Sequence, residues 1–421
     1  MEEVKPGDKI KISTVKEEIT GVLIDNQENP EIYLIKLKSG YNIGIRKDDV
    51  LKIELIEKRK DKKEEKTERI VDKNLPKIDI IVTGGTISSK IDYETGGVKP
   101  LTKPEQLFEM YPELMEIVNI KRIVMPFTKL SENMDYLDWK AIASEVEKSL
   151  NDKNCAGVIV THGTDTIHYT SAALSFFLRD LNKPVVLTYS QRSSDRASSD
   201  ARLNLICAAK MAISDVAEVM LVGHGSSNDD FCYALRGSKV RKMHSSKRDA
   251  FKPINCKSIA KIFSDKIEMS GSYNRRNEKK VILDDKFSDK IALIKFYPGM
   301  DAEIFDYLSS RYNGIILELT GLGHVASDEA RKNLLPSIKK AIDNGLVVCA
   351  TCQTIYGRLN PKVYSPGRRL EKTGVIFLED MTSETALAKL GWVLGHKDWR
   401  AKIKEKMLEN FSGEINLRLE E

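Results

Sequence analysis

Cysteine is scarce in this chain of 421 residues, which contains only six cysteines, widely scattered. Such usage excludes a disulfide framework of the kind that holds small secreted domains together. The one CxxC pair, Cys349 and Cys352, has no second CxxC and no histidine cluster to complete a tetrahedral zinc site. We therefore interpret the pair as the end of an apolar strand, and the sequence predicts no metal site.

Long apolar runs are also absent. No run reaches the length that spans a membrane, and the N-terminus "MEEVKPGDKI" lacks the basic and apolar regions of a signal peptide. We therefore expect a cytoplasmic protein without membrane contact. The 67 basic and 62 acidic residues leave a formal charge of +5, which is too small to indicate a nucleic-acid binder. Any contact with nucleic acid is expected to be local or to depend on a partner.

The texture of the sequence changes along the chain and predicts several domains. Residues 1–57 alternate short apolar runs with turn signals, which predicts a small all-β barrel of the SH3 type. Residues 58–76 mix both charge signs, as a solvated linker does. Apolar strands then alternate with helical patterns, the signature of βαβ units and an α/β fold. We expect a larger α/β domain at 77–265 with the catalytic loops, a polar connector at 266–290 and a smaller α/β domain at 291–421.

Two of the loops that follow apolar strands are rich in threonine. The first, "TGGTISSK" (83–90), contains neither a P-loop nor a GxGxxG fingerprint, and by itself it is more typical of a structural turn. The second, "THGTDT" (161–166), places hydroxyls and a carboxylate where a helix begins, although one capping residue would suffice. A helix start binds an anion and a carboxylate binds a cation, and an amino acid presents both charges. These loops are therefore candidates for the ligand crevice at the carboxyl ends of the strands.

A threonine hydroxyl that attacks a carbonyl needs a base to remove its proton. No histidine accompanies a serine or aspartate in a triad-like motif. The other usable base is a desolvated, neutral lysine, and the run "RGSKVRKMHSSKR" (236–248) supplies candidates. A solvated or phosphate-facing surface is an equally good interpretation of this basic run. Asp165 could orient such a lysine.

With these motifs in place, the sequence resembles the bacterial-type L-asparaginase superfamily. Within it, the sequence is most similar to the GatD family, the asparaginase-like subunits of archaeal Glu-tRNA(Gln) amidotransferases. The resemblance implies an asparaginase-like fold of two parallel-sheet domains, preceded by the small barrel. The motifs that carry it lie between residues 77 and 421 and are "TGGTIS", "THGTDT", "SENMD", "RGSKVRKMHSSKRDAF", "YPGMDAEIFDYL", "ELTGLGHV" and "CQTIYGRLN".

The resemblance implies catalytic roles at the matching positions. Thr86 would be the attacking hydroxyl, and Thr164 and Asp165 would form a second hydroxyl and a carboxylate linked to a lysine. The family's lysine follows the "RG" of the third motif by a few residues, which favours Lys242 over Lys239.

Substrate-binding roles follow from the same resemblance. Ser131, Glu132, Gly163 and Asp165 lie where the family holds the carboxylate and amino groups of its substrate. The flap tyrosine of asparaginases corresponds to Tyr93, which comes earlier than the family spacing and leaves Val98 near the expected place. In the family, the C-terminal domain of a neighbouring subunit completes the site, which implies a homodimer core.

The function implied is that of a glutaminase subunit with a threonine nucleophile. Ammonia released from glutamine would pass to a GatE-like partner, which uses ATP and Mg²⁺ to convert Glu-tRNA(Gln) to Gln-tRNA(Gln). The subunit itself would need no cofactor, and tRNA would bind mainly through the partner. The resemblance thus implies a ligase complex of protein biosynthesis.

Two alternatives remain open at the level of the sequence. The first is a free L-asparaginase without a tRNA role, against which stands the N-terminal β-rich segment that ordinary asparaginases lack. The second is a catalytically silent scaffold that serves as a docking surface. The presence of all the residue types needed for chemistry argues against it.

Overall fold

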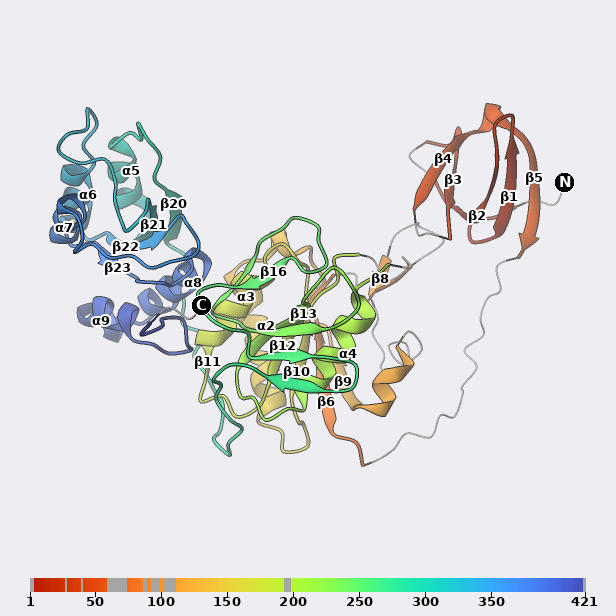
Figure 1. Ribbon diagram of the computed structural model, residues 1–421, viewed down its shortest axis with the longest axis horizontal. Coiled ribbons are helices and arrows are strands. Elements are labelled where there is room, and N and C mark those ends of the chain that lie inside the picture. Colours follow the sequence, from red (N-terminus) through yellow and green to blue (C-terminus); the bar gives the residue numbers. More distant parts are fainter. Residues whose placement is uncertain are drawn as a thin grey trace.

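The computed structural model describes residues 4–26, 29–38, 41–58, 74–85, 89–91, 98–100, 111–192 and 198–418. Thr86 and Tyr93 lie outside these ranges. The described residues form an antiparallel five-stranded sheet, a mixed eight-stranded sheet and a parallel four-stranded sheet (Figure 1). No helix among the described residues is long and apolar enough to cross a membrane.

The N-terminal sheet confirms the predicted small all-β domain. Its strand order is β4-β3-β2-β1-β5, and every neighbouring pair is antiparallel. Alternate apolar residues, among them Ile10, Ile12 and Ile35, face a small core and are fully buried, as the two-residue period of a strand requires. The elements are β1 (Lys9–Thr14), β2 (Glu18–Ile24), β3 (Ile32–Lys36), β4 (Asn42–Arg46), η1 (Lys47–Asp49) and β5 (Val50–Glu57).

The eight-stranded sheet has the order β18-β17-β14-β13-β12-β10-β6-β9, in which the five strands from β13 to β9 are mutually parallel. The edge strand β18 lies inside the segment predicted as the connector. All three of its residues, Ile-Glu-Met, are exposed, and a strand of three residues is too short to stand out from the polar residues around it. The strands are β18 (Ile267–Met269), β17 (Ala260–Ile262), β14 (Cys232–Arg236), β13 (Val219–His224), β12 (Val185–Thr188), β10 (Val158–Thr161), β6 (Lys77–Val82) and β9 (Asn119–Val124).

Helices cover both faces of this sheet. Successive residues of β10 point to opposite faces, so that Val158 and Val160 join one apolar cluster and Ile159 joins the other. Helices α2 (Tyr136–Leu150) and α3 (Ile167–Phe177) contribute to the first cluster, and α4 (Ala201–Ala212) contributes to the second. Strands buried on both faces are apolar throughout, which is why they are easy to find in the sequence.

The C-terminal sheet has the order β20-β21-β22-β23 and is parallel throughout. Its predicted CxxC ends β22, where burial raises the pKa of the Cys349 thiol to about 12. The elements of this domain are β20 (Ile291–Lys295), α5 (Glu303–Arg311), β21 (Gly314–Leu319), α6 (Leu335–Asp343), β22 (Val347–Cys352), α7 (Ser365–Lys372), β23 (Ile376–Phe377), α8 (Ser383–Gly395), η5 (Lys397–Lys402) and α9 (Ile403–Leu408).

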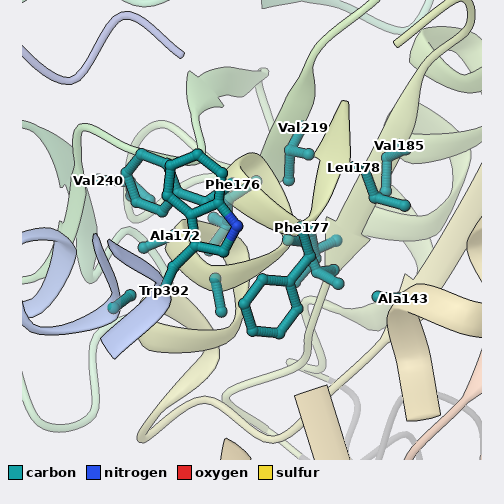
Figure 2. Packing of buried hydrophobic residues seen from close by; sticks show 14 of the residues in the cluster. Ala143, Ala172, Phe176, Phe177, Leu178, Val185, Val219, Val240 and Trp392 are labelled. Carbon is teal, nitrogen blue, oxygen red and sulfur yellow. The ribbon is translucent and has the colours of Figure 1, made fainter. Parts of the chain in front are cut away.

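Helix α8 joins the two α/β domains. One side of it contacts β20, β21 and β22, and another side contacts α3. Figure 2 shows Trp392 of α8 beside Phe176 of α3, and their rings stack with centroids 5.7 Å apart. A single apolar cluster therefore continues from the larger domain into the smaller one.

Shorter elements complete the larger domain. Three strand pairs lie outside its main sheet, and two 3₁₀ helices flank β9. These elements are β7 (Ser89–Ile91) with β8 (Val98–Pro100), β11 (Leu178–Arg179) with β19 (Ile282–Leu283), β15 (Val240–Lys242) with β16 (Phe251–Pro253), η3 (Pro112–Glu116) and η4 (Ser131–Asn133).

The strand order places a switch point between β6 and β10. The chain passes from β6 to β9 on one side, whereas it passes from β10 to β12 on the other. In open α/β sheets, ligands bind outside the carboxyl ends of the strands at such a point. The two threonine-rich loops leave the sheet here.

Candidate active site

The two threonine-rich loops pack backbone against backbone. Val82 of β6 lies opposite Thr161 of β10, and the Thr83 hydroxyl donates to the Thr161 carbonyl at 2.9 Å. Gly85 has a φ of +83°, and a Cβ atom there would lie 2.7 Å from the His162 carbonyl oxygen. Only glycine permits both this conformation and this approach. The "TGG" turn, which immediately precedes Thr86 in the sequence, thus lies directly beside the second loop.

Lys242 reaches this second loop from β15. Its Nζ donates to Thr164 Oγ1 at 2.8 Å and to Asp165 Oδ1 at 2.8 Å. The Lys242 side chain is 10% exposed, whereas that of Asp165 is 64% exposed. The structure therefore places three of the four predicted catalytic residues in direct contact. The fourth, Thr86, lies outside the described residues.

Ser131 connects the loop after β9 to the same place. The buried Ser131 hydroxyl accepts from the Asp165 N–H at 3.2 Å, and its carbonyl accepts from the Thr166 hydroxyl at 2.6 Å. A Cβ atom on Gly163 would lie 2.9 Å from the Ser131 Cβ. Glu132 follows on η4 and is exposed. Of the predicted substrate-binding residues, Ser131, Gly163 and Asp165 thus gather at the helix start, and Glu132 follows Ser131 in the chain.

The crowding of hydroxyls at this helix start has little to do with capping. Helix α3 begins at Ile167, and Thr166 in the N-cap position makes no side-chain bond to the helix backbone. Its hydroxyl is used on Ser131 instead, and that of Thr164 is used on Lys242. The hydroxyls of Thr164 and Thr166 therefore connect this loop to Lys242 and to Ser131.

Two buried histidines, one in the loop and one in the first turn of α3, carry no charge. Burial lowers the pKa of His162 to about 4 and that of His168 to about 3. The Gly163 carbonyl, 2.8 Å from His162 Nδ1, can only accept, so that nitrogen carries the proton. His162 Nε2 then accepts from the Thr170 hydroxyl at 2.9 Å. Both rings are neutral near pH 7, and His162 fixes the orientation of the Gly163 peptide.

The C-terminal domain holds the strand that carries Lys242. Lys239 Nζ lies 2.6 Å from Asp380 Oδ2, and both side chains are fully buried. Burial lowers the pKa of the Lys239 ammonium, while Asp380 acts in the opposite direction. Arg241 pairs with Glu384 of α8 at 3.2 Å, and burial raises the pKa of that carboxyl. The two cations that flank Val240 therefore fix β15 to the neighbouring domain.

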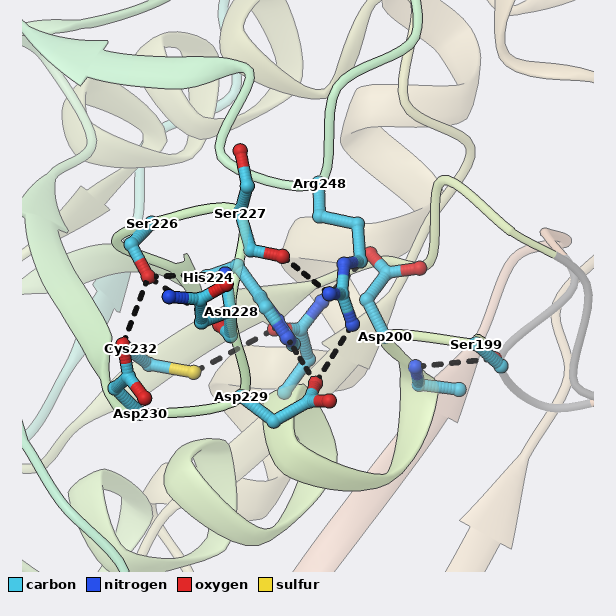
Figure 3. Close-up of polar contacts among 12 residues, drawn as sticks. Ser199, Asp200, His224, Ser226, Ser227, Asn228, Asp229, Asp230, Cys232 and Arg248 are labelled. Atoms are coloured by element: carbon cyan, nitrogen blue, oxygen red, sulfur yellow. Dashed lines mark hydrogen bonds and ion pairs between the residues drawn. The ribbon is translucent and has the colours of Figure 1, made fainter. Parts of the chain in front are cut away.

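A polar network restrains the loop that follows Lys242. Asp229 Oδ1 lies 2.9 Å from His224 Nε2 and 2.7 Å from Arg248 Nη1, so that it bridges the two side chains (Figure 3). His224 Nδ1 lies 2.6 Å from Asn204 Oδ1. The Tyr189 hydroxyl donates to the Arg248 carbonyl at 3.1 Å. The segment between β15 and β16 is thereby tied to the sheet.

The groups that the described part of the site offers are hydroxyls, a carboxylate, an amine and backbone N–H groups. This set suits attack of a hydroxyl on a carbonyl, with proton transfer through the amine. In the described part of the chain, no three or more histidine, cysteine, aspartate or glutamate side chains are grouped so as to hold a metal ion.

Comparison with known families divides the chain into three matched parts. Residues 4–56 match the GatD N-terminal domain, residues 77–275 match the N-terminal asparaginase domain, and residues 290–407 match the glutaminase/asparaginase C-terminal domain. The three matches occur in the same order as the sheets of the fold.

Curated relatives match the chain from end to end. The GatD subunit of the glutamyl-tRNA(Gln) amidotransferase of Pyrococcus furiosus is 51% identical, with 98% of this chain and 95% of the relative covered. The chain belongs to the GatD family of glutamyl-tRNA(Gln) amidotransferase subunits. The corresponding subunit of Sulfolobus acidocaldarius is 44% identical, with 97% and 91% covered. Among solved structures, the thermostable L-asparaginase of Thermococcus kodakarensis is 30% identical with a TM-score of 0.73, covering 81% of this chain and 99% of its own.

Several residues around the site of this GatD family member were not predicted from the sequence. Asp380 and Glu384 lie far along the chain from Lys239 and Arg241, and Asp380 follows Lys239 by 141 positions. The His224, Asp229 and Arg248 network likewise joins separate loops. The one signal available was the density of basic residues at 236–248, which requires carboxylate partners wherever it is buried.

Proposed function

We propose that this chain is the glutaminase subunit of a tRNA-dependent amidotransferase. The observation that carries the proposal is the contact of Lys242 Nζ with Thr164 Oγ1 and Asp165 Oδ1, each at 2.8 Å, beside the "TGG" turn. A threonine that follows this turn would have a lysine-based proton relay in the adjacent loop. The family to which the chain belongs supports the same function.

In the proposed reaction, the Thr86 hydroxyl attacks the side-chain amide carbon of glutamine. Thr164 and Lys242 relay the hydroxyl proton to the amide nitrogen, which leaves as ammonia when the C–N bond breaks. Backbone N–H groups near the glycines stabilise the oxyanion. Water then hydrolyses the threonine ester, which releases glutamate and restores Thr86.

The helix start provides a clamp for the amino-acid part of the substrate. The Asp165 carboxylate is 64% exposed while it contacts Lys242, so its free face is available to the α-ammonium group. Ser131 and Gly163 lie beside this position, and Glu132 follows Ser131 on η4; these residues would hold the α-carboxylate and the ammonium. The N–H groups that begin α3 favour an anion at this place.

The ammonia is proposed to pass to a GatE-like partner subunit. That partner would use ATP and Mg²⁺ to activate the glutamate of Glu-tRNA(Gln), so that this subunit needs no cofactor of its own. The absence of a P-loop from the sequence and the formal charge of +5 fit this division of labour. We further propose a homodimer core and a cytoplasmic complex, because the substrate would be a charged tRNA.

The test is co-purification with a candidate GatE-like partner, followed by transamidation assays with glutamine or with ammonia as nitrogen donor. Thr86→Val and Lys242→Ala are each expected to abolish the glutamine-dependent reaction and to leave the ammonia-dependent reaction intact. Ammonia bypasses the glutaminase, so the second assay shows that the complex has assembled. Loss of both activities would indicate defective folding or docking and would not support the assigned roles.

A free L-asparaginase is the second candidate, and the similarity to a solved L-asparaginase favours it. The match of residues 4–56 to the GatD N-terminal domain favours the amidotransferase. Efficient release of ammonia from asparagine by the purified chain, without any partner, would overturn the amidotransferase function.

A further inference from the structure

A second cavity lies at the sheet edge opposite the candidate active site. Its volume is about 340 Å³, which falls within the range of about 300–1,000 Å³ that is typical of small-molecule sites. The walls come from β11, from the amino end of β13, from the segment before β19 and from the C-terminal segment around Phe411. The threonine-rich loops leave the carboxyl ends of the strands, whereas this cavity lies at the amino end of β13. The two sites are therefore separate.

Arg179 on β11 is the distinctive side chain of this cavity. Its guanidinium lies 4.8 Å from the centre of the Phe411 ring and 5.6 Å from that of Trp392. These contacts fix the guanidinium through its faces and leave the N–H groups at its edges unused. In the described part of the chain, the Arg179 guanidinium has no hydrogen-bond or ion-pair partner. It is a half-buried cation held in place with its donors free.

The carboxylates of the cavity wall already have cations of their own. Glu218 pairs with Arg236 at 2.8 Å and also accepts from the Asn274 N–H at 2.8 Å. Asp180 pairs with Lys279 at 3.2 Å. These contacts neutralise the acidic groups of the wall and leave the charge of Arg179 uncompensated. The cavity therefore favours an anion.

We propose that this cavity binds the phosphate group of a small molecule. Arg179 would hold two of the phosphate oxygens through its guanidinium fork, as arginine commonly does. The side-chain amide of Asn274 belongs to a different wall, before β19. A tetrahedral anion presents oxygens toward several walls at once, whereas a planar carboxylate presents two oxygens in one plane. Phosphate is thus the better match to donors on separate walls.

The test is titration of the full chain with inorganic phosphate in a calorimeter at low salt. The unmodified chain is expected to show one saturable site. Arg179→Gln is expected to weaken binding by about tenfold or more, because hydrogen bonds to charged groups contribute about 1.5–3 kcal/mol. Arg311→Gln is the matched control. Arg311 likewise lies over an aromatic ring, 5.0 Å from the centre of Tyr307, but it is exposed and outside the cavity.

The control is expected to bind phosphate as the unmodified chain does. Absence of saturable binding in the unmodified chain, or equal binding by Arg179→Gln, would overturn the proposal. Near-ultraviolet circular dichroism of the tryptophans checks that Arg179→Gln is folded. If that variant does not fold, Asn274→Ala, at the exposed rim of the cavity, replaces it in the test. This variant is expected to weaken phosphate binding severalfold. Unchanged binding would reject the site.

Discussion

Lys239 and Lys242 lie three residues apart in one basic run, and each contacts a carboxylate at a similar distance. Lys239 lies 2.6 Å from Asp380 with both side chains fully buried, whereas Lys242 lies 2.8 Å from Asp165, whose side chain is 64% exposed. The distances alone would make the two pairs equivalent. They differ in burial: the first pair is enclosed between the two α/β domains, whereas the second is open to solvent on its Asp165 side.

The difference follows from what each position contacts. The Lys239 ammonium also donates to the Asp380 carbonyl at 3.0 Å, and a second oxygen of that carboxylate accepts from the Asn416 N–H at 3.1 Å. Every group of this pair thus has a fixed partner inside the protein. Lys242 shares its ammonium between a hydroxyl and a carboxylate that solvent reaches. The Asp165 carboxylate therefore keeps a free face for another partner, which the Asp380 carboxylate lacks.

The largest effect on stability is expected from Asp380→Ala. The substitution leaves the Lys239 ammonium buried without its carboxylate, and loss of one partner of a buried pair costs about 3–5 kcal/mol. Urea unfolding of the full chain measures the free energy of unfolding. The double variant Lys239→Met with Asp380→Leu is the control and should recover most of the loss. If Asp380→Ala lowered the free energy of unfolding by less than about 1 kcal/mol, this pair would contribute no more to stability than an exposed ion pair.

Lowering the pH should produce the next largest effect on the free energy of unfolding. This effect arises near Lys242, at the loop and helix that carry His162 and His168. His162 and His168 have pKa values of about 4 and about 3 in the folded chain, whereas an unfolded histidine titrates near 6.5. The unfolded state therefore binds protons first as the pH falls below 6.5. Each histidine should lower the free energy of unfolding by about 2 kcal/mol between pH 7 and pH 5.

Urea unfolding at the two pH values measures this loss. His168→Phe provides the control, because phenylalanine keeps the packing against Tyr169 and Phe251 and removes one titrating group. The loss on acidification should be smaller in this variant. An unchanged pH dependence would contradict the assignment of His168 as a buried neutral ring.

The smallest effect on stability is expected from Asp165→Asn. An exposed ion pair contributes about 0–1 kcal/mol, so the free energy of unfolding should change by no more than that. Glutamine hydrolysis by the complex should nevertheless fall by about a hundredfold or more, the range for loss of a group in a proton relay. Unchanged glutamine hydrolysis would show that the Asp165–Lys242 pair has no catalytic role. A loss of several kcal/mol would show that this pair is structural, as the Asp380–Lys239 pair is.

Much of the fold could be predicted from the sequence because its strands are buried on both faces. Strands such as β10 and β13 read as apolar runs that end in glycine- or threonine-rich loops. The edge strand β18 could not be found in this way, since its three exposed residues, Ile-Glu-Met, are too few to form a recognisable run in a polar segment. The pairing of β11 with β19 depends on tertiary contact between distant two-residue strands, for which no local pattern exists.

The loops of the candidate site could be predicted from the sequence, but the residues that hold these loops in place could not. The threonine motifs identified Thr164 and Asp165, and the family resemblance favoured Lys242 over Lys239. Both lysines lie in the same basic run, so only the fold shows that Lys239 pairs with Asp380. The predicted roles of Thr86 and Tyr93 stay predictions, because these residues lie outside the described ranges.

The position of α8 limits how the two α/β domains can move. Because this helix belongs to the core of both, through α3 on one side and β21 on the other, a hinge between the domains would expose apolar surface in each. Cooperative units of unfolding follow such shared cores. The larger and smaller domains should therefore lose structure together in a single unfolding transition.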